Sequence, residues 1–250
     1  MGLAFIFIIG LCIGSFLNVC IYRIANGESI AFPPSHCMKC GTEIKKRDLI
    51  PVISYVLLMG KCRKCGDKIS IRYPLIELAN GLLYILVYLS EGFSLGLIKG
   101  CIFISLLLVI AFIDFDTHEV YRSTIIFGVV VGIIFLVLNY TLEGVLPWNN
   151  IVGALIGYGV IWLIVILTKG MGEGDIDIAM VCGLFLGLKG MVLNLFLAFV
   201  IGGIAATILL VLRKMGRKSE MAFGPYLALG GIITLLYGSR IIDVYLNVFL

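Results

Sequence analysis

Apolar residues occur along this chain in long runs that short polar segments separate. A helix that crosses a bilayer needs about 20 mainly apolar residues, and most of the runs approach this length. The pattern therefore predicts an all-α polytopic membrane protein. We expect about eight transmembrane helices, over residues 3–22, 74–90, 95–113, 123–141, 151–168, 176–188, 190–212 and 223–239. A tight turn near Lys189 and Gly190 should join the sixth helix to the seventh.

The composition agrees with a membrane protein and excludes other classes. Hydrophobic residues make up 61% of the 250 residues and charged residues 14%, whereas about 25% of residues are charged in ordinary soluble proteins. A soluble enzyme, a disordered tail and a fibrous protein are therefore excluded. One polar segment, 23–72, holds ten Lys/Arg and four Asp/Glu. We expect three parts: a first transmembrane helix (1–22), a polar insert (23–73) and a transmembrane core (74–250).

Lysine and arginine in the connections predict the orientation, because these residues are enriched on the cytosolic side of membrane proteins. With the N-terminus outside, 16 of the 19 basic residues fall on the cytosolic side: ten in the insert, then Arg122, Lys169, Arg213, Lys214, Arg217 and Lys218. Three fall outside: Lys99, Lys189 and Arg240. The insert should therefore be cytosolic, together with the connections after the third and fifth helices.

Four cysteines in the insert form two CxxC pairs, Cys37 with Cys40 and Cys62 with Cys65. This pattern is typical of a tetrahedral zinc site, and the glycine after each pair helps the chain turn back over a metal. Disulfides are rare in the cytosol, so zinc is favoured over a redox pair or four ordinary cysteines. A shell of four thiolates has no open position for water, so the zinc should be structural. The apolar stretch 49–59 is too short to span and could lie on the membrane surface.

Two predicted cytosolic connections carry carboxylates beside apolar helix ends: Asp114, Asp116 and Glu119 in one, and Glu173, Asp175 and Asp177 in the other. Ionisable groups at the membrane boundary are costly and are candidates for function. The residues leave three interpretations open. The acids could cap the helices that follow, form a divalent-cation or ion-transport site, or supply one acid each to a pair that shares a proton and hydrolyses a peptide bond. The glycines at 172 and 174 would let a substrate backbone lie beside Asp175.

Other sites are poorly supported. The only histidines are His36 and His118, and neither has a nucleophile at a recognisable spacing. There is no phosphate-binding glycine loop and no zinc-protease His-Glu-x-x-His pattern. The basic insert lacks interleaved aromatic residues, so nucleic acid is not an expected partner.

The order of several motifs resembles the type IV prepilin peptidases, which are polytopic aspartyl proteases of the GxGD type. The first motif, Gly14-Ser-Phe-Leu-Asn-Val-Cys-Ile-Tyr-Arg23, precedes the two cysteine pairs. Ile71-Arg-Tyr-Pro-Leu-Ile-Glu77 follows them, and Ile113-Asp114 ends the third predicted helix. Gly172-Glu-Gly-Asp175 follows the fifth predicted helix, and Phe223-Gly-Pro-Tyr226 opens the last one. The resemblance covers the whole length of the chain.

The resemblance implies a multi-pass enzyme of the bacterial inner membrane that removes the short basic leader from prepilins and pseudopilins at the cytosolic face. Many members of the family then methylate the new N-terminal amine with S-adenosylmethionine, although no residue that binds this methyl donor is recognisable here. The implied catalytic aspartates of the 74–250 core are Asp114 and Asp175, with Asp116 as the rival for the first position. Lysine is common in the family where Asp177 stands. A cation transporter or channel that uses the same acids, with a zinc-stabilised cytosolic module, remains the alternative from another class.

Overall fold

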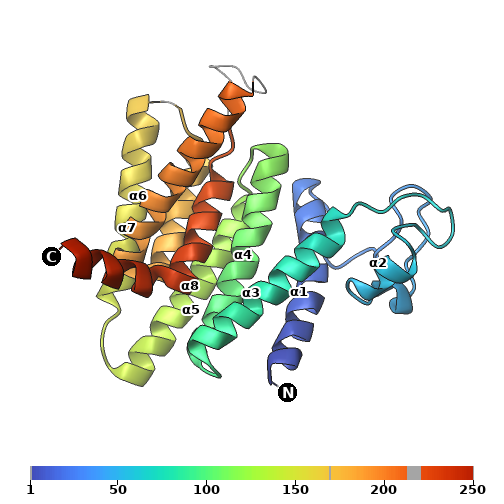
Figure 1. Cartoon of the computed structure of the whole chain (residues 1–250), viewed down its shortest axis with the longest axis horizontal. Coiled ribbons are helices and arrows are strands. Elements are labelled where there is room, and N and C mark those ends of the chain that lie inside the picture. The colour runs from blue at the N-terminus through green and yellow to red at the C-terminus, as the bar shows by residue number, and fades with distance from the viewer. Residues whose placement is uncertain (1, 169, 213–220, 250) are drawn as a thin grey trace. The chain divides into compact units, whose positions relative to one another are not determined.

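The computed structural model describes residues 2–168, 170–212 and 221–249, and this part of the chain is helical, without a named β-strand. The all-α prediction is confirmed. Figure 1 shows the helices, which are α1 (Gly2–Ala25), α2 (Ile53–Leu57), α3 (Arg72–Glu91), α4 (Leu95–Thr117), α5 (Arg122–Glu143), α6 (Trp148–Thr168), α7 (Glu173–Val211) and α8 (Gly224–Phe249). A short 3-10 helix, η1 (Lys46–Leu49), precedes α2.

Seven of the described helices, all except α2, are long and apolar enough to cross a membrane. The five-residue α2 lies in the short apolar stretch of the insert, and its contact with the membrane surface stays a prediction. By contrast, α7 has 39 residues, which is about twice the length that a bilayer core requires. It is interrupted at Gly187, where φ is 71° and ψ is −179°.

The chain folds back at Gly187, because residues before and after it lie beside the beginning of α8. A Cβ atom placed on Gly224 would lie 3.0 Å from Cδ1 of Ile178, which precedes the break. A Cβ atom placed on Gly202, which follows the break, would lie 3.5 Å from the ring of Phe223. Both parts of α7 therefore reach the same end of α8.

The two parts of α7, 173–186 and 188–211, correspond to the sixth and seventh predicted helices. The eight predicted crossings therefore correspond to the seven long helices when the two parts of α7 are counted separately. The turn was expected near Lys189 and Gly190, and the break lies at Gly187 instead. The φ and ψ angles at residue 187 are accessible almost exclusively to glycine. The break therefore lies at Gly187 because the backbone conformation there requires a glycine.

Close packing of α6 against the first part of α7 depends on small residues. A Cβ atom on Gly153 would lie 2.6 Å from the carbonyl carbon of Gly187, and one on Gly157 would lie 2.4 Å from the carbonyl oxygen of Ala179. Small residues let membrane helices approach this closely. Gly153 and Gly157 therefore serve the close packing of these helices. Figure 1 shows α6, α7 and α8 side by side in this part of the molecule.

Two asparagines at the beginning of α6 satisfy backbone groups that the break in α7 leaves without helical partners. Asn150 Nδ2 donates to the carbonyl oxygen of Leu184 at 2.8 Å, and the backbone N–H of Leu188 donates to Asn149 Oδ1 at 3.2 Å. Unpaired backbone groups are costly inside a membrane, so side chains of this kind make a broken helix tolerable there.

The chain forms two compact units, residues 1–109 and 110–250, and the boundary falls within α4. In the first unit, α1 packs on α3 and the buried Asn80 joins these helices to α4. Asn80 Nδ2 donates to the carbonyl oxygen of Gly10 at 2.7 Å, and Ser105 Oγ donates to Asn80 Oδ1 at 3.2 Å. The second unit holds the two acidic connections.

The membrane orientation stays a prediction. Five of the basic residues behind it lie outside the described residues: Lys169, Arg213, Lys214, Arg217 and Lys218. The division of the chain into a first helix, an insert and a protease core also stays a prediction.

We expect Gly187→Ala to destabilise the protein by about 1–3 kcal/mol, because alanine is strained at this positive φ. Its Cβ atom would also lie 2.6 Å from Asn149 Nδ2. Gly203→Ala is the matched control, since it lies in the same helix and a Cβ atom there would have no neighbour within 4 Å. Thermal unfolding of both variants in detergent measures the difference. Equal melting temperatures would contradict the role assigned to the break.

Candidate active site and metal centre

Asp114 lies in the last turn of α4 and points into the protein. The helix ends just after it, because His118 has a φ of 55° and its backbone N–H donates to the Asp114 carbonyl oxygen at 2.8 Å. The Asp114 side chain is 4% exposed, whereas Asp116 is exposed. Residues two apart point about 200° away from each other around a helix, so only one of the two acids can face the interior.

Asp175 occupies the first turn of α7. Gly172 is the N-cap residue of this helix, and its backbone N–H donates to the carboxylate of Asp175, three positions later. An acid at this position normally satisfies an N–H group that the helix leaves unpaired. Asp175 therefore caps α7, as one of the three interpretations proposed. Capping acids usually lie at the surface, whereas Asp175 is only 5% exposed, so capping does not account for its burial.

Gly224, the first residue of α8, contacts the Asp114 carboxylate. Its backbone N–H donates to this carboxylate, and a Cβ atom at residue 224 would lie 2.5 Å from Asp114 Oδ2. The N-terminus of a helix carries a partial positive charge that favours an anion. Sequence reasoning placed Gly224 in a family motif but gave it no role. The Phe223–Tyr226 motif was the one sequence signal that could have pointed to Gly224. Its contact with Asp114 could not be predicted, because it depends on where α8 begins relative to α4.

The two acidic connections meet at Gly174. A Cβ atom on this glycine would lie 2.5 Å from both Cβ and Cγ2 of Val120. Any side chain at residue 174 would therefore displace the connection that follows Asp114. We expected Gly172 and Gly174 to make room for a substrate backbone. For Gly174 this expectation is wrong, since the space is taken by Val120 of the same chain.

The Asp114 and Asp175 carboxylates lie close enough for a direct electrostatic interaction. Asp114 Oδ2 is buried and has no hydrogen-bond partner among the described residues. A buried polar atom of this kind normally has a partner, so its isolation points to a role with water or a substrate. Two neighbouring carboxylates can share one proton, and such a pair can supply a general base and a general acid together.

The other acids of these connections do not join the pair. Asp116, Glu119 and Glu173 are exposed, and the charge of Asp177 interacts with that of Arg122. The six acids also form no cluster suited to a metal ion. Among the described residues, one group of three or more His, Cys, Asp or Glu side chains could hold a metal, and it consists of the four cysteines of the insert.

The four cysteines converge as their spacing predicted. The sulfur atoms of Cys37, Cys40, Cys62 and Cys65 all lie within 4.8 Å of one another, and those of Cys37 and Cys65 are 3.8 Å apart. Four sulfurs arranged tetrahedrally at zinc–sulfur distances of about 2.3 Å would be separated by about 3.8 Å. The cluster therefore has the ligands and the dimensions of a structural zinc site.

Each cysteine pair forms the same type of turn. The backbone N–H of Gly41 donates to the Cys37 carbonyl oxygen at 2.8 Å, and that of Gly66 donates to the Cys62 carbonyl oxygen at 2.9 Å. The φ angles of these glycines are 66° and 72°, values that favour glycine. The predicted role of the glycines in turning the chain is confirmed.

Hydrogen bonds to the sulfur atoms favour thiolates in part of the cluster. The hydroxyl of Thr42 lowers the pKa of Cys40 to about 6, and the backbone amides of Cys65 and Lys64 lower the pKa of Cys62. At Cys65 a hydrogen bond from the Asp67 backbone lowers the pKa, but partial loss of hydration and hydrogen bonds with the other three cysteines outweigh it and raise the pKa to about 11.

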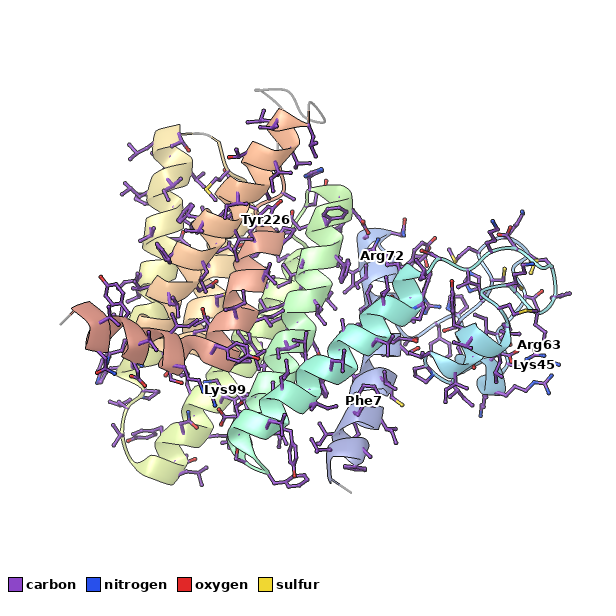
Figure 2. All side chains as sticks on the ribbon, in the orientation of Figure 1. Phe7, Lys45, Arg63, Arg72, Lys99 and Tyr226 are labelled. Carbon is purple, nitrogen blue, oxygen red and sulfur yellow. The ribbon has the colours of Figure 1, made fainter. Side chains whose placement is uncertain are left out.

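Two ion pairs tie the segments around the cysteines together. Arg63 donates to both carboxylate oxygens of Asp48, in η1, at 2.7 and 2.9 Å. The Arg63 guanidinium lowers the pKa of Asp48, so this pair weakens as the pH falls through that pKa. Lys39 Nζ lies 2.8 Å from Asp67 Oδ1 and links the two cysteine pairs. Figure 2 shows Arg63 and the neighbouring Lys45 among the side chains of this segment.

Comparison with known proteins gives matches along most of the chain. Residues 8–90 match the family model "Bacterial Peptidase A24 N-terminal domain", and residues 101–207 match the model "Type IV leader peptidase family". No solved structure matches the chain significantly.

Several curated relatives named "Prepilin leader peptidase/N-methyltransferase" match nearly the full length. The relative from Neisseria gonorrhoeae is 36% identical, over 90% of this chain and 87% of its own. That from Bacillus subtilis is 31% identical, over 98% of both chains. That from Pseudomonas aeruginosa is 32% identical, over 96% of this chain and 92% of its own. The chain therefore belongs to the type IV leader peptidase family.

Proposed function

We propose that this protein is an aspartic endopeptidase that removes the leader peptide from prepilins and pseudopilins, and that it then N-methylates the new N-terminus. The observation that carries the peptidase assignment is that Asp114 and Asp175 are both buried and near enough for their charges to interact. Family membership and the printed names of the relatives supply the substrate class and the second activity.

In the proposed reaction the two aspartates act on one water molecule. The ionised carboxylate takes a proton from the water, and the protonated carboxyl donates to the carbonyl oxygen of the scissile peptide bond. The carboxylates exchange these roles as the amine of the mature pilin leaves and the leader takes the new carboxyl group. The N–H groups of Gly172 and Gly224 hold the two carboxylates in place through hydrogen bonds.

The pair lies where a membrane-anchored substrate can reach it. Asp114 precedes the end of α4 by three residues, and Asp175 lies in the first turn of α7. A prepilin can keep its apolar helix in the bilayer while its basic leader reaches this end of the helices. The distribution of Lys and Arg supports the cytosolic side of the bacterial inner membrane for the site.

We expect Asp114→Asn and Asp175→Asn each to lower leader cleavage by at least about a hundredfold, because an amide cannot exchange a proton with water in this way. The assay is cleavage of a purified prepilin in detergent or liposomes, with size-exclusion chromatography as the check on folding. Asp116→Asn is the matched control, since this exposed residue lies on the same helix. Full activity of the Asp175 variant would overturn the assignment.

The same assay separates a peptidase from a cation transporter. Cleavage by the purified protein should continue when free magnesium and calcium are removed, because the aspartate pair needs no metal. Cation flux into vesicles that depends on Asp114 and Asp175, without any cleavage of the prepilin, would favour the transporter instead.

We also propose that Cys37, Cys40, Cys62 and Cys65 bind one structural zinc ion. The double variant Cys37→Ser/Cys62→Ser should lose about one equivalent of zinc and expose the insert to protease, because two thiolate ligands are missing. Cys12→Ser, an exposed position on α1, should keep the metal. Elemental analysis of purified protein measures both. Absence of zinc from the unaltered protein would contradict the proposal and leave the peptidase assignment intact.

A further inference from the structure

The apolar stretch of the insert turns its large side chains outward. Leu57 is 75% exposed and Met59 is 82% exposed. Ile53, Val56 and Leu57 share one face of α2, because they are three and four positions apart. Exposed apolar patches of this kind mark interaction sites. We call the six exposed residues of the stretch the apolar face: Leu49, Ile50, Ile53, Val56, Leu57 and Met59.

Hydrogen bonds hold the opposite side of α2 against the rest of the insert. Ser54 is 6% exposed, and its hydroxyl donates to the carbonyl oxygen of Arg47 at 3.0 Å. The hydroxyl of Tyr55 donates to the carbonyl oxygen of Ile69 at 3.3 Å. A helix at the surface of a soluble protein normally buries apolar side chains and exposes polar ones. Because α2 does the reverse, its outer side suits an apolar environment.

The apolar face lies beside the beginning of α3, which is long and apolar enough to cross a membrane. Val52, the residue before α2, donates its backbone N–H to Glu77 Oε2 at 2.7 Å. Glu77 is five residues after Arg72, where α3 begins, so it lies about 8 Å farther along the helix axis. The polar layer on each side of a bilayer core is about 5–8 Å thick. A bilayer that α3 spans therefore reaches the level of α2.

Basic side chains flank the apolar stretch on both sides. Asp48 is the one acid between residues 45 and 64, and Arg63 binds its carboxylate. None of the four lysines in this range belongs to an ion pair among the described residues. Positive charge around an apolar surface favours binding to anionic lipids. The exposed basic residues in this range are Lys45, Lys46, Arg47, Lys61, Arg63 and Lys64.

We propose that the apolar face docks on the surface of the bilayer that α1 and α3 span, and that the flanking basic side chains bind anionic phospholipid headgroups there. The insert begins after α1 and ends at α3, so both of its ends are tied to this surface. The apolar side chains enter the boundary between headgroups and acyl chains, while the lysines and arginines stay among the phosphates. The docking depends on neither proposed activity.

Fluorescence of a single tryptophan in the full-length protein tests the docking. Trp148→Phe and Trp162→Phe remove both native tryptophans, and Leu57→Trp then places one on the apolar face. In lipid nanodiscs that hold one copy of the protein, phospholipids with brominated acyl chains should quench this tryptophan at least about twofold, because the indole lies at the apolar boundary. Glu43→Trp, at an exposed position of the insert outside the apolar face, is the matched control and should be quenched less.

Thermal unfolding and size-exclusion chromatography report whether each variant is folded, and Val56→Trp decides if Leu57→Trp is not. Emission typical of an indole in water, without quenching, would overturn the docking. Emission shifted to the blue only in nanodiscs that hold two copies, again without quenching, would also overturn it and would assign the apolar face to a second copy of the chain.

The same tryptophan at residue 57 tests the lipid charge. Adding the anionic lipid phosphatidylglycerol to phosphatidylcholine nanodiscs should increase the quenching, and Lys45→Gln/Lys46→Gln should abolish this increase. Lys189→Gln, at an exposed lysine outside the insert, should keep it. Equal quenching in the two lipid mixtures would overturn the role of anionic headgroups and leave the apolar docking in place. Prepilin cleavage measures the proposed peptidase activity separately.

Discussion

Two buried carboxylates, Asp114 and Asp175, whose charges interact are the feature on which the second unit depends. Burial disfavours the ionised form of each acid, and each negative charge repels the other. The fold offsets this cost with the beginnings of two helices. The N–H of Gly172 binds Asp175 at the start of α7, and the N–H of Gly224 binds Asp114 at the start of α8. Backbone N–H groups therefore stabilise the two carboxylates, and Asp114 Oδ2 has no partner among the described residues and can act on water or substrate.

This arrangement requires unusually close packing of helices. Gly153 and Gly157 let α6 lie against the first part of α7, and Gly187 lets the second part return toward the beginning of α8. Asn149 and Asn150 satisfy the backbone groups that the break exposes. Inside a membrane the hydrophobic effect does not drive helices together, so close contact and satisfied polar groups hold this part of the chain.

The aspartate pair and the cysteine cluster belong to different units of the chain. The aspartates lie within residues 110–250 and the four cysteines within residues 1–109. A fifty-residue polar insert has little apolar surface to bury, and a bound metal would stabilise it in place of an apolar core.

Sequence alone determined the features that depend on local pattern. Apolar length predicts the helices, CxxC spacing predicts the cysteine cluster, and the acids beside helix ends identify the two connections that meet. Tertiary structure decided the rest, because it depends on residues far apart in the chain. The direction of the last turn of α4 separates buried Asp114 from exposed Asp116. Contacts of Gly224 with Asp114 and of Gly174 with Val120 arise only when several helices pack, and no pairwise spacing along the chain encodes such contacts.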